Sequence, residues 1–194
     1  MPSRTLARIV VATVISLQRL VTVVGLLSHC HNLTASRPAT SCAELQCHKG
    51  ATVSGIYEIT SQEGERKQVY CDLITEGGGW TAVQKRIEGD RDTNFGRVYA
   101  DYKAGFGGAS TSYWLGLDTM HSLPSKEAWQ LRLHLTGCDE NHTVFAQYNR
   151  FQVGNESEGH RLSVGEFTLG SHGDHELDYH DGALFSASDY DDAP

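Results

Sequence analysis

The chain has 194 residues, of which 39% are apolar and 9% aromatic; this is typical of one globular domain with its own core and excludes wholesale disorder. The formal net charge of −8 is unevenly spread, because residues 1–40 hold four arginines and no acidic residue, whereas residues 155–194 hold ten acidic residues and only Arg161. So acidic a C-terminal quarter argues against nucleic acid as a partner and fits a cation site or a solvated surface.

The N-terminal segment has the pattern of a targeting sequence. Arg4 and Arg8 give it a positive start, and residues 9–17 form an apolar run of the length found in secretory signals. A second apolar run over residues 20–27 follows an interruption at Arg19.

The interruption bears on whether this segment spans a membrane. An arginine near the centre of a spanning helix costs about 2.5–3.5 kcal/mol on insertion scales. The sequence therefore favours a cleaved secretory signal over residues 1–28 with a short leader over 29–40, and the alternative is a type II signal-anchor.

Glycosylation sequons and cysteines agree with an extracellular, oxidising compartment. The three sequons begin at Asn32, Asn141 and Asn155. Cysteines in such a compartment are expected to pair, and an odd number leaves at least one over. The five are Cys30, Cys42, Cys47, Cys71 and Cys138.

The next part of the chain is rich in β signals. Residues 53–59 and 67–73 alternate as two strands with a turn at Gly64 between them, and residues 80–86 form a third strand. The glycines at 77–79 before this third strand fit a hairpin connection. A phosphate cradle is excluded because no Lys-Ser/Thr pair or amphipathic helix follows.

A helix is predicted over residues 94–105, with Asn94 as its N-cap and Gly105 at its end. Its apolar stripe, which we expect to pack in the core, consists of Phe95, Val98, Tyr99 and Tyr102. A second short helix is predicted over residues 115–122, before Pro124.

The remaining pattern predicts more strands. Residues 130–135 and 143–151 alternate as a hairpin around a polar loop, and residues 161–164 add one more strand. Many short strands with two helices indicate an α+β domain on a mainly antiparallel sheet.

An enzymatic metal site is the most tempting chemical interpretation of the C-terminal region. Its candidate ligands are His172, Asp174, His175, Asp178, His180 and Asp181. The run lacks the HExxH helical frame, and no GxSxG nucleophile elbow occurs in the chain. We therefore expect no catalytic residues and a non-enzymatic binding module, with a metal-dependent enzyme as a remote alternative.

Ordered motifs over residues 41–192 resemble the fibrinogen C-terminal domain of fibrinogens, ficolins, tachylectins, tenascins and angiopoietins. They read VYCD from Val69, GGGWT from Gly77, YWLGLDTMH from Tyr113, FAQYNRFQVG from Phe145 and GDHELDYHDGALFS from Gly173. The resemblance implies a mainly antiparallel sheet with short flanking helices. It also implies a partial domain over 41–194 that lacks the last subdomain, whose missing closing strand would expose a sheet edge.

The resemblance also implies a covalent framework. The family places one cysteine before its SG.Y strand and bonds it to the cysteine of VYCD, which here pairs Cys42 with Cys71. It assigns no role to Cys30 or Cys47, and Cys138 stands where the family usually has tryptophan, so we expect it to be a small buried apolar residue.

The family's calcium loop corresponds to the acidic C-terminus. Asp189 and Asp191 match its first two aspartates, while Ala193 occupies the third position and Asp192 is a possible substitute. Calcium prefers six to eight oxygen ligands, so we expect weak calcium binding, if any.

The family's pocket for acetylated sugars would lie beyond Pro194, so no ligand-binding residue can be assigned. The resemblance implies a secreted, lectin-like recognition protein that binds extracellular glycans, with loss of the pocket expected to impair it. The alternative is a matrix or receptor-ligand module that binds cell-surface or matrix proteins.

Overall fold

The structure, a computed structural model, describes residues 17–26, 37–123, 129–137, 143–171 and 177–190. Its helices are α1 (Cys42–Lys49), α2 (Tyr99–Ala104) and α3 (Leu117–His121), with 3-10 turns η1 (Thr75–Gly77), η2 (Glu156–Glu158) and η3 (Asp178–His180). Its strands are β1 (Leu17–Leu26), β2 (Gly55–Thr60), β3 (Arg66–Asp72), β4 (Trp80–Arg86), β5 (Phe106–Gly107), β6 (Tyr113–Trp114), β7 (Trp129–Gly137), β8 (Thr143–Tyr148), β9 (Phe151–Val153), β10 (Leu162–Val164) and β11 (Phe167–Gly170).

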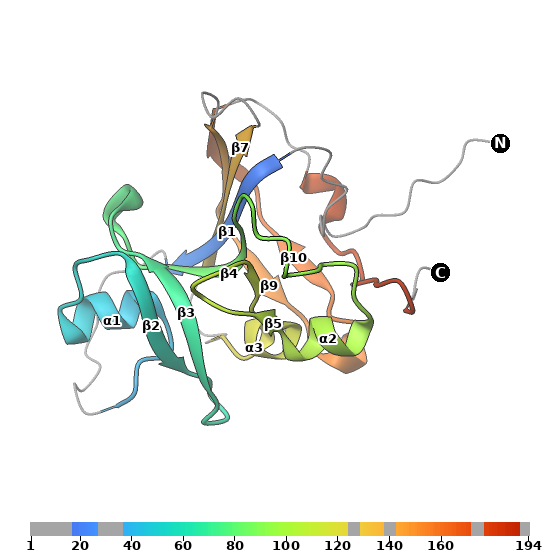
Figure 1. The fold of residues 1–194 in the computed structure, drawn as a ribbon, viewed down its shortest axis with the longest axis horizontal. Helices are drawn as coiled ribbons and strands as arrows, with labels where there is room; N and C mark the ends of the chain where they lie inside the picture. The colour runs from blue at the N-terminus through green and yellow to red at the C-terminus, as the bar shows by residue number, and fades with distance from the viewer. Residues whose placement is uncertain (1–16, 27–36, 124–128, 138–142, 172–176, 191–194) are drawn as a thin grey trace.

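One large sheet organises the domain (Figure 1). Its strands follow the order β11-β8-β7-β1-β4-β3-β2, with β6 beside β4 and β5 beside β6, and β9 and β10 form a separate pair. Every strand pairing within the described residues is antiparallel. This confirms the predicted α+β fold with a mainly antiparallel sheet and short flanking helices.

The central strand comes from an unexpected part of the chain. Residues 17–26, part of the signal predicted over residues 1–28, form β1 and lie between β4 and β7. In Figure 1 this blue strand crosses the middle of the molecule. The described sheet is therefore continuous from β11 to β2. The exposed edge expected from a missing closing strand stays a prediction.

The hairpins of the N-terminal half follow the sequence closely. The strands expected over 53–59 and 67–73 are observed as β2 and β3, with ends shifted by no more than two residues, and the third matches β4. The glycine connection before β4 is tightly packed, because a β-carbon at Gly78 would lie 2.4 Å from the carbonyl oxygen of Leu73. Only glycine fits there, and the φ of 84° at Gly78 has the same requirement.

The predicted helix over 94–105 is wrong in its first half. α2 begins at Tyr99, and Asn94 instead accepts a hydrogen bond from the Gly96 amide at 2.8 Å, which forms a turn. Phe95 is buried as predicted, whereas Val98 is 42% exposed because it lies outside the helix. The second helix is also shorter than predicted, and α3 covers its centre.

The strand predicted over 143–151 is divided. β8 ends at Tyr148, and Asn149 then exchanges hydrogen bonds with Glu166: its amide donates to the Glu166 carbonyl and its side chain accepts from the Glu166 amide. The chain changes partner here, so that β9 starts at Phe151 and pairs with β10.

Candidate functional site: the disulfide and the acidic C-terminal loop

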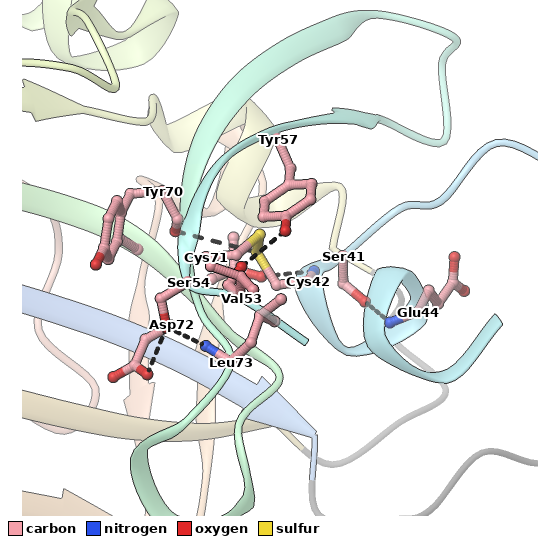
Figure 2. Close-up of a disulfide and its surroundings, with 12 residues drawn as sticks. Ser41, Cys42, Glu44, Val53, Ser54, Tyr57, Tyr70, Cys71, Asp72 and Leu73 are labelled. Atoms are coloured by element: carbon pink, nitrogen blue, oxygen red, sulfur yellow. Dashed lines mark hydrogen bonds between the residues drawn. A yellow bond between two sulfur atoms is a disulfide. The ribbon is translucent and has the colours of Figure 1, made fainter. Parts of the chain in front are cut away.

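The disulfide between Cys42 and Cys71 joins the start of α1 to β3 (Figure 2). It is the pair that the family resemblance implies. Both cysteines are fully buried, their Cα atoms are 5.5 Å apart, and the bond closes a chain segment of 29 residues. The bond therefore fixes the N-terminal part of the family-like segment to the sheet.

Two hydrogen bonds fix the start of α1 beside the disulfide. The Ser41 side chain caps the helix by accepting from the Glu44 amide at 3.2 Å, and the Cys42 amide donates to the Thr81 hydroxyl of β4 at 3.1 Å. Gly50 ends the helix in the left-handed conformation. The capped start of α1 is thus held against the sheet by two bonds, the disulfide to β3 and the hydrogen bond to Thr81 of β4.

Cys47, on the same helix, is disulfide-bonded as well. Its partner lies outside the described residues, as do Cys30 and Cys138. The framework is thus larger than the single bond that the resemblance implies.

The acidic C-terminal loop begins at Phe185 and is described up to Tyr190; it is hydrogen-bonded to α2 through Asp189. Its carboxylate accepts a hydrogen bond from the Tyr99 backbone amide at 2.7 Å, and Val98, the N-cap residue of α2, makes no side-chain cap of its own. A carboxylate at this end also complements the helix dipole. Asp191 and Asp192, the other two predicted calcium ligands, lie outside the described residues.

Replacing Asp189 by alanine should lower the free energy of unfolding by about 0.5–2 kcal/mol, because α2 loses its N-terminal cap. Asp189→Asn is the matched control, since asparagine keeps the oxygen acceptor and removes the charge. Chemical denaturation of both variants measures the effect. Equal stability of Asp189→Ala and the unaltered protein would contradict the capping role.

Aromatic side chains hold the rest of this loop. The Tyr190 ring stacks on the Tyr99 ring with centroids 4.2 Å apart, and Phe185 is completely buried. The Phe185 ring lies 5.2 Å from the Tyr102 ring and 6.3 Å from that of Trp114. The loop is therefore an integral part of the core around α2.

His160 is buried beside the same helix. The Tyr99 hydroxyl and the His160 Nδ1 atom are 2.8 Å apart, and Nε2 lies 3.4 Å from a carboxylate oxygen of Asp118. A carboxylate only accepts, so Nε2 carries the proton and Nδ1 accepts from the tyrosine hydroxyl. Burial lowers the pKa of His160 below its ordinary value of 6.5, although the hydrogen bond to Asp118 acts in the opposite direction.

The lowered pKa of His160 predicts acid sensitivity. The unfolded chain binds a proton at His160 more readily than the folded chain does. The stability that neutral, buried His160 contributes is therefore present above pH 6.5 and is lost as the pH falls below 6.5 toward the folded-state pKa. Urea unfolding between pH 7.5 and 5 should show His160→Asn with a shallower decline than the unaltered protein. Asparagine suits the backbone here, since His160 has a φ of 44°. Parallel declines would contradict this role.

The residues weighed as candidate metal ligands, which we did not expect to be catalytic, are only partly described. His172, Asp174 and His175 lie outside it, as does the side chain of Asp178. Asp181 accepts a hydrogen bond from the Val164 amide at 2.8 Å and is thus used structurally. His180 is half-buried, and its Nδ1 atom has no hydrogen-bond partner among the described residues.

The described residues contain no group of three or more histidine, cysteine, aspartate or glutamate side chains arranged to hold a metal ion. Of the calcium ligands implied by the family only Asp189 is described, and one of its oxygens accepts a hydrogen bond from the Tyr99 amide. Weak calcium binding therefore stays a prediction.

Asn155 is the one predicted glycosylation site within the described ranges, since Asn32 and Asn141 fall in their gaps. It begins the turn η2 and accepts hydrogen bonds from the Ser157 hydroxyl and the Glu158 amide, at 2.7 and 3.0 Å. Both residues after it in the sequon are exposed.

Comparison with known proteins places this geometry in a family. Residues 39–193 match the model of the C-terminal globular domain of fibrinogen beta and gamma chains. The chain is similar to human ficolin-3 (39% identity over 151 residues, 78% of this chain and 49% of ficolin-3) and to human tenascin-R (40% over 144 residues, 73% of this chain and 10% of tenascin-R).

The fold agrees with the sequence relationship. The fibrinogen-like globe domain of human ANGPTL2 superposes with a TM-score of 0.72 at 31% identity, covering 79% of this chain and 69% of that domain. The fold and the sequence together define a fibrinogen-like globe. The chain belongs to the fibrinogen C-terminal domain family, as its motifs predicted, and spans about half the length of ficolin-3.

Membrane attachment was the alternative to secretion. Across the described ranges, no helix combines the length and apolar character that a membrane crossing requires.

Proposed function

We propose that this chain is a non-enzymatic, extracellular recognition module that binds glycans or proteins through its fibrinogen-like domain. The observation that carries the proposal is the match of residues 39–193 to the family, together with a fold shared with a fibrinogen-like globe. The relatives include a ficolin and a tenascin. These are the two kinds of protein for which the resemblance implied lectin-like recognition and matrix binding. The buried Cys42–Cys71 disulfide supports an oxidising compartment.

The two kinds of partner can be separated directly. The full chain is purified from the medium of secreting cells and applied to a glycan array with and without EDTA, and in parallel to immobilised matrix and cell-surface proteins. Binding to acetylated sugars supports the lectin-like function, and saturable binding to a protein supports the matrix or receptor-ligand function. Absence of binding in both formats contradicts a recognition role.

Calcium binding by this module is proposed to be weak. Affinity for calcium depends on the number of charged ligands and on the rigidity of the site. Asp189 is engaged by the Tyr99 amide, and the position of a third family aspartate is Ala193. Titration calorimetry should therefore give a dissociation constant above the micromolar range, and a micromolar constant would show a competent site.

Glycosylation at Asn155 tests the extracellular assignment. The secreted chain should lose mass on treatment with peptide N-glycosidase, and Ser157→Ala should abolish the part that comes from this site, because the sequon requires a hydroxyl residue. Asn155→Asp is the matched variant, since aspartate also removes the glycan but keeps an oxygen that can cap η2. An unchanged mass in both variants would show that this site is not used.

A further inference from the structure

The central strand of the sheet lies outside the segment that matches the family. The family match begins at residue 39, whereas β1 covers residues 17–26. The same residues lie within the signal predicted over residues 1–28. A cleaved leader leaves the chain, so one segment cannot be both a removed leader and a strand of the mature domain.

β1 joins the two halves of the described sheet. Leu20 to Val24 pair with β4, and the strand from Leu17 to Leu26 pairs with β7 along its whole length. β4 and β7 are not paired with each other. Without β1, each of them would present a long edge of unpaired amides and carbonyls, which is costly in the interior and prone to association.

The burial of two valines shows that β1 is an interior strand. Val23 is 2% exposed and Val24 is completely buried. Neighbouring residues of a strand point to opposite faces, so both faces of the sheet are covered at this point. The residues paired with these valines on the adjacent strands are buried as well: Thr81, Ala82, Leu131 and Arg132.

The second disulfide of α1 bears on the same segment. With Cys42 and Cys71 bonded to each other, the sequence leaves Cys30 and Cys138 as candidate partners for Cys47. In the sequence, Cys138 directly follows Gly137, which pairs with Leu17 at one end of β7. The opposite end of β7, at Trp129, pairs with Leu26 and lies about 30 Å away along the strand.

α1 lies near the end of β1 at Leu26. Thr81, which accepts the hydrogen bond from the first residue of α1, pairs with Val24. The Cα atoms of a disulfide must come within about 7 Å of each other. Cys30, four residues after the end of β1, is therefore the partner that the strand geometry favours for Cys47.

We propose that residues 17–26 are a permanent strand of the mature domain, and that any leader is removed before Leu17. Hydropathy cannot distinguish the two uses, because an apolar run rich in β-branched residues suits a leader and a buried strand alike. The apolar run over residues 9–17 has by itself the length that a signal requires. The inference is independent of what the module binds.

The decisive measurement is the N-terminus of the secreted full-length chain, read by N-terminal sequencing and by intact mass after deglycosylation. The expected product begins at or before Leu17. A product that begins after Leu26 overturns the proposal. Non-reducing peptide mapping of the same material should recover Cys47 bonded to a peptide that contains Cys30, and a Cys47–Cys138 peptide would contradict the strand geometry.

Hydrogen exchange on the same protein tests the strand itself. The amides of β1 should exchange as slowly as those of β4, since both open only with the sheet. Val24→Ala should speed exchange in β1 and β4 by about tenfold, whereas Val53→Ala, at a residue 69% exposed, should leave both unchanged. Rapid exchange in β1, or equal behaviour of the two variants, would show that the segment is not part of the folded core.

Discussion

Replacing Cys71 by serine is expected to lower the free energy of unfolding by about 2–5 kcal/mol, the usual cost of losing a native disulfide from a secreted domain. The bond to Cys42 closes a segment of 29 residues, for which the chain-entropy model gives about 3–4 kcal/mol. Both cysteines are fully buried, so the serine hydroxyl would also have to find a hydrogen-bond partner in the core. Denaturant unfolding followed by tryptophan fluorescence measures the loss.

Matched variants separate the bond from the side chains. Cys42→Ser should cost about as much as Cys71→Ser, and the double variant should cost little more than either, because the bond is already lost in each single variant. Cys71→Ser with the denaturation midpoint of the unaltered protein would contradict a structural disulfide.

Phe185→Ala should destabilise the domain by about 3–5 kcal/mol, as expected for truncating a large aromatic side chain in a core. Phe185 is completely buried and contacts the rings of Tyr99, Tyr102 and Trp114. The truncation would leave a cavity and would also loosen the acidic loop that caps α2. Denaturation gives the magnitude, and hydrogen exchange should show faster exchange in α2.

Tyr179→Ala is the control for Phe185→Ala. Tyr179 is also an aromatic residue of the C-terminal region, but it is 87% exposed, so its truncation should change stability by no more than about 0.5 kcal/mol. A comparable loss of stability in both variants would contradict a specific role for the buried Phe185 ring, because truncation of any aromatic side chain in the C-terminal region would then have the same effect.

The local sequence pattern was sufficient to predict the hairpin strands of the N-terminal half. β2, β3 and β4 were predicted within two residues because alternating side chains and a glycine turn are encoded within a few positions. α1 was missed, although Ser41 and Glu44 have the spacing of a capping box. The helix has only a weak apolar stripe, so its capping residues were its main signal, together with Gly50 at its end.

The features that were not predicted correctly depend on contacts between segments that lie far apart in the sequence. Asp189 caps α2 from a position 90 residues beyond Tyr99, and a helix prediction that looked for a local cap chose Asn94 instead. The buried contact between His160 and Tyr99 spans 61 residues and has no motif. The disulfide between Cys42 and Cys71 could be assigned only because the family resemblance supplied the pairing.

The position of β1 has a consequence for folding. Leu26 pairs with Trp129 and Leu17 with Gly137, so the first strand of the sheet meets β7, the second of its two partners, more than 100 residues later. Contacts at such sequence separation slow folding, because a long chain must be closed before they form. The edge of β1 that faces β7 must therefore stay unpaired until β7 has been synthesised, even after β4 has formed, and chaperone binding at residues 17–26 is expected during that interval.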